Sequence, residues 1–402
     1  MSRRLFIVSP TESCLTHRGD RHPKLAARFA AQGWDVCYIS SDFYHAEKRH
    51  FSTEEVAAAR ERAGYELKLF HVPAYGDNIS FSRWWGYVWL ALRCFFFLLP
   101  RIRGADVLLV PCRPPEILLA GRLLKLLRQN VLIMDVRDIW PDGLPLRSTF
   151  IHRLFALYCR LLNRLAASGA DFAFYTAKGF LPWLLRYIHY DKTQFIPLGF
   201  DERRWQESRP LTFADFPDGV IRLFFVGDLA KSMEIAPLVR AMAANHRYSL
   251  TFIGGGERLE DIRTLAREVN ADNITFTGRM TPEAVTRTIR GQHISVIPLK
   301  VKFSMPNKLF DALGARRPLL VYGHNDAADF ALVEKIGWQL NFDAGEEVGF
   351  LNSLQPEEVI AASIRVDHIR MAYSKEYLYQ QMVQKINQIS HFTSQKESEK
   401  QI

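Results

Sequence analysis

The residues best suited to chemistry lie between positions 297 and 321, in the sequence IPLKVKFSMPNKLFDALGARRPLLV. The pattern predicts a strand, a loop, a helix that opens at Pro306 and ends at Gly314, and a second strand. The first turn of such a helix presents unpaired amides and a partial positive charge, and Lys308 lies beside them. Asp311 is about one turn further on, where its carboxylate can accept hydrogen bonds from a sugar. The segment therefore predicts a pocket for a phosphate joined to a polyol, as in a nucleotide or a nucleotide sugar.

A plain structural reading fits the same segment. It is then an ordinary connection between two strands, with Leu309, Phe310 and Leu313 packed on a sheet. Lys308 and Asp311 are three residues apart and would pair on the helix surface, which is worth a few tenths of a kcal/mol. The segment by itself leaves both readings open.

Two glycine-containing turns in the same half of the chain follow predicted strands. In FVGDLAKSM, Gly227 ends a strand and Lys231 precedes the next helix, where a lysine can serve as a point charge for phosphate. In FIGGGE, Gly254 and Gly255 allow positive φ and close approach to a ligand. The alternatives are a solvated loop lysine and an ordinary glycine turn.

The loop after the first strand, THRGDRH, carries the polar residues of the first half. Arg18 or Arg21 can clamp a phosphate, Gly19 permits close approach, and His17 or His22 can transfer a proton. The spacing supplies too few ligands for a metal site, so no metal is expected. A polar surface loop is the alternative.

A second charged segment, DVRDIWPD, follows a predicted buried strand. We expect Arg137 beside the acceptor and Asp138, with Arg18, in a catalytic role. A structural salt bridge is the alternative for Arg137 and Asp138.

Size and composition set broad limits. The chain has 402 residues and a net charge of +9, from 52 basic and 43 acidic residues, which predicts two domains and an anionic partner. The basic residues form no stripe with interleaved aromatic residues, which disfavours nucleic-acid binding. Five scattered cysteines without CxxC spacing fit a reducing cytoplasm. The opening MSRRLFIVS has too short an apolar run for a signal peptide and reads as a strand.

One apolar run, WWGYVWLALRCFFFLL at 84–99, needs a membrane test. At about 24 Å as a helix it is too short to span a bilayer, and Arg93 lies within it. It is either a buried helix or an interfacial helix with Trp84, Trp85 and Trp89 at the level of lipid headgroups. The second reading predicts peripheral contact with an anionic membrane through Trp84–Arg103. The arginines that would meet the lipid are Arg83, Arg93, Arg101 and Arg103.

Strands and helices alternate along the chain, which predicts parallel sheets covered on both faces. The predicted strands are 4–9, 35–40, 67–72, 107–111, 131–136, 172–176, 194–197, 221–226, 249–253, 274–277, 294–298, 318–322 and 337–341. The predicted helices are 22–32, 52–63, 82–99, 115–128, 150–167, 178–187, 233–245, 257–269, 282–290, 307–314, 326–334, 356–364 and 373–390. A polar stretch near 206–219 separates a domain over 1–205 from one over 206–372, and 373–402 forms a helix with a frayed tail.

Four segments resemble, in order and spacing, the nucleotide-sugar domain of the GT-B glycosyltransferases, in particular the large family numbered four. They are VGDLAKSMEIAPLVRA, FIGGGERLEDI, ITFTGRMTPEAV and VIPLKVKFSMPNKLFDALGARRPLLV. The resemblance covers 221–322 closely, and DVRDIWPD matches a recurrent segment of the family. It implies an α/β fold of two Rossmann-like, doubly wound parallel-sheet domains that face each other across a cleft.

The resemblance also implies roles for residues. Asp311 takes the place of a glutamate that holds the ribose hydroxyls, and Lys231 neutralises the diphosphate with Lys308 as a helper. Phosphate or sugar would contact the backbone of the segment formed by Met305, Pro306 and Asn307. No metal and no further cofactor are expected.

One position departs from the family pattern. Phe303 stands where many members have a second glutamate that contacts the donor sugar, and this puts the sugar contact and the donor preference in doubt. The implied activity is retaining transfer of a hexose from a nucleoside diphosphate sugar to an acceptor. We expect a lipid-linked glycan in bacterial surface polysaccharide synthesis, on the inner face of the membrane. A nucleotide-sugar epimerase and a non-catalytic partner with the same fold stay open.

Overall fold

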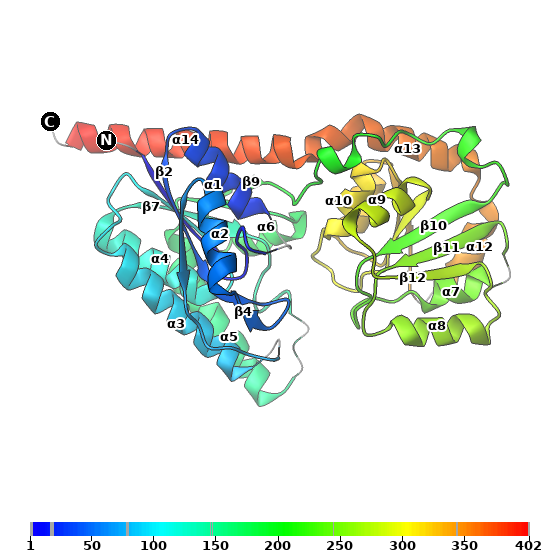
Figure 1. Ribbon diagram of the computed structural model, residues 1–402, viewed down its shortest axis with the longest axis horizontal. Coiled ribbons are helices and arrows are strands. Elements are labelled where there is room, and N and C mark those ends of the chain that lie inside the picture. Colours follow the sequence, from blue (N-terminus) through cyan, green and yellow to red (C-terminus); the bar gives the residue numbers. More distant parts are fainter. Residues whose placement is uncertain are drawn as a thin grey trace. The chain divides into compact units, whose positions relative to one another are not determined.

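The computed structural model describes residues 3–16, 20–77, 80–144, 146, 148–243, 245–342 and 345–400, with backbone only beyond 392 (Figure 1). His17, Arg18 and Gly19 lie outside the described residues. The chain forms two compact units, Met1–Ile196 with Tyr379–Ile402, and Pro197–Leu378. Each unit is described by itself below.

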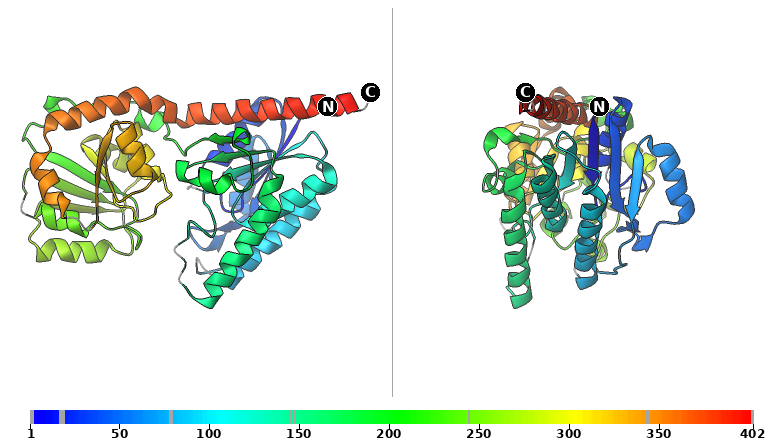
Figure 2. Two further views of the ribbon diagram at one scale, coloured as in Figure 1. Left: turned by 180° about the vertical axis from the view of Figure 1, so that it is seen from behind. Right: turned by 90° about the vertical axis from the view of Figure 1, so that its left-hand side faces the viewer.

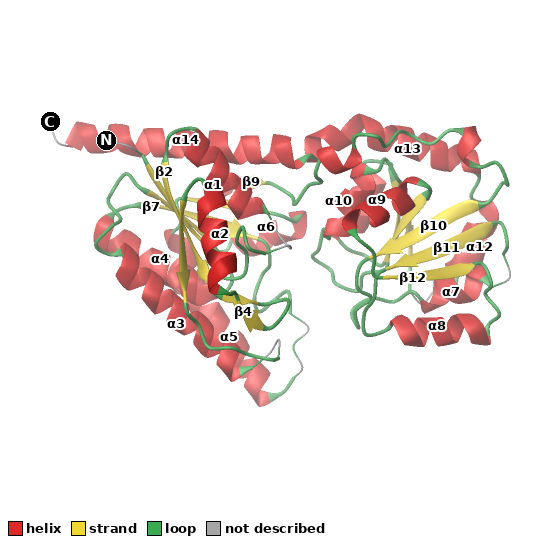
Figure 3. Ribbon diagram, in the orientation of Figure 1, coloured by secondary structure: helices red, strands yellow, loops and turns green. Residues whose placement is uncertain are grey.

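The first unit contains a seven-stranded parallel sheet with the order β5-β2-β1-β6-β7-β8-β9. Figure 3 draws the strands in yellow. Its central strands are almost wholly apolar and buried, as expected for a parallel sheet covered on both faces. The strands are β1 (Arg4–Val8), β2 (Asp35–Ser41), β5 (Glu66–Phe70), β6 (Val107–Pro111), β7 (Val131–Val136), β8 (Phe172–Tyr175) and β9 (Thr193–Phe195).

Helices cover both faces of this sheet (Figure 2). On one face, α4 packs against β6 and β7 and against its two neighbours, α3 and α5. On the other face, α1 packs on β1 and β2, and α2 on β5. The helices are α1 (Arg21–Ala31), α2 (Thr53–Ala63), α3 (Phe81–Leu98), α4 (Pro115–Arg128), α5 (Phe150–Ala166) and the short α6 (Leu181–Leu184).

The second unit has a six-stranded parallel sheet with the order β12-β11-β10-β13-β14-β15. The strands are β10 (Ile221–Val226), β11 (Tyr248–Ile253), β12 (Ile274–Gly278), β13 (Ile294–Ile297), β14 (Leu319–Tyr322) and β15 (Gly337–Leu340). The helices are α7 (Ala236–Met242), α8 (Leu259–Glu268), α9 (Pro282–Arg290), α10 (Asn307–Gly314), α11 (Asp326–Val333), α12 (Glu346–Ser353) and α13 (Pro356–Arg370). Side chains of β10, β11, β13 and β14 form its core.

The predicted alternation and the two parallel sheets are confirmed, whereas several details were wrong. A hairpin of β3 (Phe43–Tyr44) and β4 (Arg49–His50) was missed because two-residue strands leave no periodic signal, and α12 was missed as well. Helix α7 begins later than predicted, since Met233 instead bridges Leu299. Helix α14 (Lys375–Lys400) continues through the tail predicted to fray, in a sequence rich in good helix formers.

The division into units also falls earlier than the predicted boundary at 205. The segment after Pro197 belongs to the second unit because Phe200 bridges Ser374 and the Trp205 ring packs on Gly314. The last helix returns to the first unit, where the Tyr379 hydroxyl donates to Asp20 at 3.1 Å. Among the described residues, no helix combines the length and apolar character needed to cross a bilayer.

Candidate functional site

The strand order of the second unit marks where a ligand would bind. The order of strands reverses between β10 and β13, which are neighbours in the sheet. Ligands of open parallel sheets bind beyond the carboxyl ends of the strands at such a switch point. The predicted donor residues lie in the connections that leave β10, β11 and β13, so the topology brings all three segments to one edge of one sheet.

The glycines of the first two segments pack backbone against backbone. Gly227 and Gly254 both adopt positive φ, at +112° and +133°. A Cβ on Gly254 would lie 2.3 Å from the carbonyl oxygen of Gly227, and the Gly227 amide donates to Ile253 at 2.9 Å. Gly255 differs, since its φ is not positive and its nearest neighbour is the flexible side chain of Arg279. The turn therefore needs glycine at 254 to join the two loops, a role that the sequence did not reveal.

Lys308 connects the third segment to the first. Its Nζ lies 4.0 Å from the centroid of the Phe225 ring and 3.7 Å from the Met233 sulfur. A Cβ on Gly227 would be 3.8 Å from the same Nζ. Burial lowers the pKa of Lys308 to about 8, which the Asp228 carboxylate partly opposes. The site thus holds a lysine whose charge is costly until an anion compensates it.

Helix α10 presents its amino end at this edge of the sheet. The helix begins at Asn307, so Pro306 is the N-cap residue instead of the first helical residue that was predicted. Met305 is buried below it, and Asn307 is exposed. The inward face of α10 packs as the structural alternative predicted, because Leu309, Phe310 and Leu313 are fully buried.

Asp311 and Lys308 have different partners, so the surface pair of the structural reading is not what the helix forms. Arg204 donates to Asp311 Oδ1 at 3.2 Å, from a segment far away in the sequence. Burial raises the pKa of the Asp311 carboxyl, and Arg204 and then Lys375 oppose that effect. Arg204 also donates to Thr286 at 2.7 Å, which holds it in place. Arg204 is a residue that the sequence analysis missed, because only the fold brings it to the helix.

Lys231 has the surroundings of a surface lysine. Its side chain is 85% exposed, and its Nζ lies 3.3 Å from Glu257, which follows the glycine turn. The pair connects the loop after β10 with the loop after β11. Of the two lysines predicted to bind the donor, Lys308 has the more enclosed side chain and Lys231 the more exposed one.

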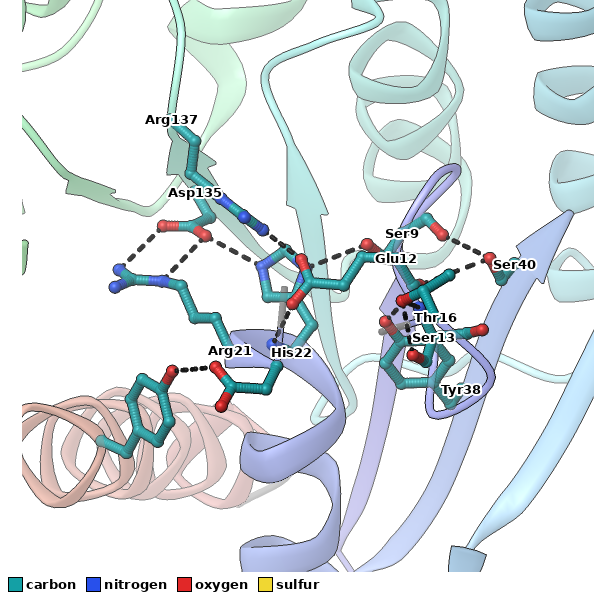
Figure 4. Close-up of polar contacts among 12 residues, drawn as sticks. Ser9, Glu12, Ser13, Thr16, Arg21, His22, Tyr38, Ser40, Asp135 and Arg137 are labelled. Carbon is teal, nitrogen blue, oxygen red and sulfur yellow. Dashed lines mark hydrogen bonds and ion pairs between the residues drawn. The ribbon is translucent and has the colours of Figure 1, made fainter. Parts of the chain in front are cut away.

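In the first unit, the order of strands reverses between β1 and β6, and the loop after β1 joins a buried charged network (Figure 4). Arg21 donates two hydrogen bonds to Asp135, at 3.1 and 3.0 Å. His22 Nε2 lies 2.9 Å from the same carboxylate, and its Nδ1 lies 3.1 Å from the Ser9 hydroxyl. Arg21, His22 and Asp135 are all at most 2% exposed. Arg21 therefore binds the buried Asp135 carboxylate, and a phosphate contact by Arg18 or Arg21 stays a prediction.

The same network includes Glu12 and Arg137, which form an ion pair. Burial would raise the pKa of Glu12, but Arg137 and His22 outweigh burial and hold it below its usual range. Burial likewise opposes the ionisation of Asp135, and Arg21 and His22 lower the pKa of that carboxyl strongly. Both carboxylates are therefore charged near neutral pH, with cations that offset the cost of burial.

Arg137 and Asp138, expected together, take part in different contacts. Arg137 pairs with Glu12, whereas Asp138 pairs with Arg113 at 2.7 Å and also accepts from the Ile139 amide. Glu12 was missed by the sequence analysis, although it is the only acidic residue in the loop between β1 and His17. That signal is weak, because one glutamate in a loop is normally solvated.

Comparisons with known proteins bear on the second unit and on the fold. Residues 221–340 match the model of a family described as glycosyl transferases group 1, which confirms the expected resemblance of 221–322 to glycosyltransferases, whereas the resemblance to the family numbered four stays a prediction. No curated protein matches the sequence.

Solved structures resemble the whole chain. HepE of Anabaena, in complex with UDP, superposes with a TM-score of 0.70 at 10% identity, over 96% of this chain and 100% of that chain. Sucrose-phosphate synthase of Thermosynechococcus elongatus gives 0.68 at 14% identity, over 96% and 99%. WaaG, a glycosyltransferase involved in lipopolysaccharide biosynthesis, gives 0.63 at 14% identity, over 95% and 99%. The protein therefore has the GT-B fold of these glycosyltransferases, and residues 221–340 of its second unit resemble the glycosyl transferases group 1 family.

Proposed function

We propose that this protein is a glycosyltransferase that moves a sugar from a nucleoside diphosphate sugar to a lipid-linked glycan. The main support is the cluster at the switch point of the second unit, where Gly227, Lys308 and the amino end of α10 converge. The match to the glycosyl transferases group 1 family covers this cluster. HepE, which has a similar fold, has been solved in complex with UDP.

The chemistry follows from charge. Departure of a nucleoside diphosphate leaves negative charge on the leaving oxygen, and preorganised cations and helix amides stabilise such charge most where water is excluded. Lys308 has the enclosed position for that role, and Lys231 can approach from the exposed loop. The Asp311 carboxylate would accept hydrogen bonds from the ribose hydroxyls, and Arg204 would orient that carboxylate. No step needs a metal, and the assignment of a retaining mechanism and a hexose follows the family resemblance alone.

The lipid-linked acceptor is supported by an apolar surface on the first unit, here called the α3–α5 surface. Large apolar side chains project from α3, α4 and α5, which pack side by side. They are Phe81, Trp85, Trp89, Leu92 and Phe96 on α3, Leu123, Leu126 and Leu127 on α4, and Phe150, Ile151, Leu154, Leu157, Leu161 and Leu165 on α5. Exposure reaches 80% at Phe150 and 75% at Ile151. A soluble protein rarely leaves so many large apolar side chains together in water.

Arginines accompany this apolar surface. Arg153, Arg160 and Arg164 are exposed on α5, and Arg93 is exposed on α3 beside the Trp89 ring at 5.7 Å. Apolar residues flanked by arginines fit the headgroup region of an anionic bilayer better than they fit a protein partner. We therefore place the protein peripherally on the inner face of the cell membrane, where lipid-linked glycans for surface polysaccharide are extended.

The predicted contact through Trp84–Arg103 changes in detail. Trp84 packs edge-on against Tyr158 at 6.1 Å, so Trp85 and Trp89 remain as the outward tryptophans of that helix. Helix α5 contributes more of these side chains than α3 or α4 does, and its contribution was missed. It is apolar on two faces. Ala156, Cys159, Leu162 and Ala166 are buried, while Leu154, Leu157, Leu161 and Leu165 face outward. A sequence pattern marks apolar faces but does not tell which one packs.

A panel of nucleoside diphosphate sugars, incubated with bacterial membrane extract as the acceptor, tests this proposal. Release of nucleoside diphosphate together with labelled lipid supports transfer. An isomerised donor without release would instead support an epimerase, and binding without product a non-catalytic partner. Lys231→Ala should lower turnover strongly, whereas Lys192→Ala, at an exposed lysine of the first unit, should not. Equal turnover in the two variants would contradict the phosphate role of Lys231.

A further inference from the structure

Asp42, His50 and His71 bring three metal-ligating side chains together in the first unit. Asp42 follows strand β2, His50 ends β4 of the hairpin, and His71 follows β5. One ligand atom from each residue lies within 4.8 Å of the others. The cluster shares no residue with the Glu12–Asp135 network or with the donor residues.

The three side chains present a consistent geometry. His50 Nδ1 lies 3.1 Å from Asp42 Oδ1, and His71 Nδ1 lies 2.8 Å from Oδ2. Two bonds of about 2.0–2.1 Å to a tetrahedral zinc ion separate their ligand atoms by about 3.4 Å. The two observed spacings run to different oxygens of the Asp42 carboxylate and are about 0.3 and 0.6 Å shorter than that value, so side-chain shifts of that order would admit an ion.

The backbone around Asp42 is fixed from several directions. The Asp42 amide donates to Phe70 at 3.0 Å, and the Phe51 amide donates to the Asp42 carbonyl at 2.9 Å. The Val72 amide donates to Asp42 Oδ1 at 3.2 Å, which orients the carboxylate as hydrogen-bonded outer groups do in metal sites. Cluster residues are thus held by two neighbouring strands and the hairpin.

The two imidazole rings are fixed by aromatic contacts. They stack on each other with centroids 4.7 Å apart, and the Phe43 ring meets His50 edge-on at 5.2 Å. This stacking turns the same nitrogen of both rings, Nδ1, toward one carboxylate. Other histidine–aspartate pairs of the chain bring one ring to one carboxylate, as His189 does with Asp191 at 2.7 Å.

We propose that Asp42, His50 and His71 bind a divalent metal ion of the zinc class. Two imidazoles with one carboxylate suit zinc and similar transition metals, whereas magnesium and calcium prefer oxygen ligands. His71 is 71% exposed, which leaves the fourth position of the ion open to water. The ion would join the β3–β4 hairpin to the edge formed by β2 and β5. It would take the place of the protons through which Nδ1 of His50 and Nδ1 of His71 hydrogen-bond to Asp42. Binding therefore stabilises the first unit.

Titration of the tag-free, full-length protein tests the site. Cobalt(II), followed by its visible absorption, and zinc, followed by competition with a chromophoric chelator, should each bind with one equivalent, and zinc should raise the melting temperature. His71→Gln removes an exposed ligand without affecting the core and should weaken zinc binding at least tenfold and abolish the melting shift. His189→Gln is the matched control at an exposed histidine paired with aspartate, and should bind zinc as the unmodified protein does.

Two results would overturn the proposal. One is the lack of a stoichiometric zinc or cobalt site in the folded protein. The other is a His71→Gln variant that binds zinc as tightly as His189→Gln. His50→Gln supplies an independent check, because it leaves Asp42 in place and should weaken zinc binding as His71→Gln does. Magnesium in large excess should not displace cobalt. Displacement would show that cobalt binds at an oxygen-rich site elsewhere, and this would also contradict the proposal.

Discussion

The ammonium of Lys308 lies 4.0 Å from the centre of the Phe225 ring, at the carboxyl end of the strand where the order of the second sheet reverses. The contact places a cation over an aromatic face, which compensates only part of the hydration that burial removes. Its pKa is accordingly lowered to about 8. The charge of the Lys308 side chain therefore depends on whether an anion is bound beside it.

Binding of UDP should consequently depend on pH. The cationic form of Lys308 binds the diphosphate, and the free protein loses that form as pH rises through about 8. We expect the affinity for UDP to fall between pH 7 and pH 9, approaching about tenfold per unit at the upper end. Lys308→Arg keeps its charge over this range and should give a flat profile in calorimetry. An equally steep profile in Lys308→Arg would assign the titration to another group.

Gly254→Ala and Gly255→Ala form a matched pair of neighbouring substitutions. A Cβ at 254 would lie 2.3 Å from the Gly227 carbonyl oxygen at a φ of +133°, whereas one at 255 would first meet the Arg279 side chain at 3.3 Å. We expect Gly254→Ala to lower the free energy of unfolding by more than the roughly 1–2 kcal/mol of a left-handed residue, and to weaken UDP binding. Gly255→Ala should leave both nearly unchanged. Chemical denaturation and calorimetry measure the two effects, and equal stability of the variants would refute the close packing of the two loops.

Asp135→Asn should destabilise the first unit strongly. The substitution removes the buried partner of Arg21 and His22 and leaves a cation uncompensated, which costs about 3–5 kcal/mol. Asp272→Asn, at an exposed pair with His246, should have little effect on thermal unfolding.

The sign of the pH dependence follows from the lowered pKa of Asp135. Burial raises this pKa, but Arg21 and His22 lower it by more. The stabilisation is fully present above the unfolded pKa of about 3.9 and is lost progressively as pH falls from there through the lowered pKa of the folded protein. The difference in stability between the natural protein and Asp135→Asn should therefore shrink below about pH 4. A difference that is constant through this range would show that the Asp135 charge is not what stabilises the fold.

Phe150→Ser combined with Ile151→Ser and Leu154→Ser should release the protein from anionic vesicles. These side chains are at least 57% exposed, so their loss removes contact with lipid without opening the core. Trp85→Ser with Trp89→Ser should act in the same direction, with Trp84 left in place because it packs inward. Cosedimentation with phosphatidylglycerol vesicles, compared with neutral phosphatidylcholine vesicles, measures the effect.

The matched control for the vesicle experiment lies in the second unit. Leu332 and Val333 are 47% and 70% exposed at the end of α11, and serine at both should leave vesicle binding unchanged. Full binding by the Phe150, Ile151 and Leu154 variant, with an unchanged melting temperature, would exclude the α3–α5 surface as the membrane contact.

The sequence by itself determined the architecture and the place of the helix in the segment predicted to bind the donor. Apolar runs separated by amphipathic helices specified two parallel sheets, because the period of side chains is set by the local backbone. The helix of this segment was predicted to open at Pro306 and end at Gly314, and it forms over 307–314 with Pro306 as its N-cap residue. Gly227 and Gly254 were also identified, because a strand that ends in glycine marks a special backbone conformation whatever its neighbours are.

Only the tertiary structure decided which partners those residues have. Arg204 reaches Asp311, and Glu12 reaches Arg137, across long separations in sequence that no local pattern records. The outward leucines of α5 could not be told from core leucines, because periodicity reports that a face is apolar and not what lies against it. Burial and the proximity of charges arise when distant segments pack, and they give Lys308 and Asp135 properties that their identities alone do not contain.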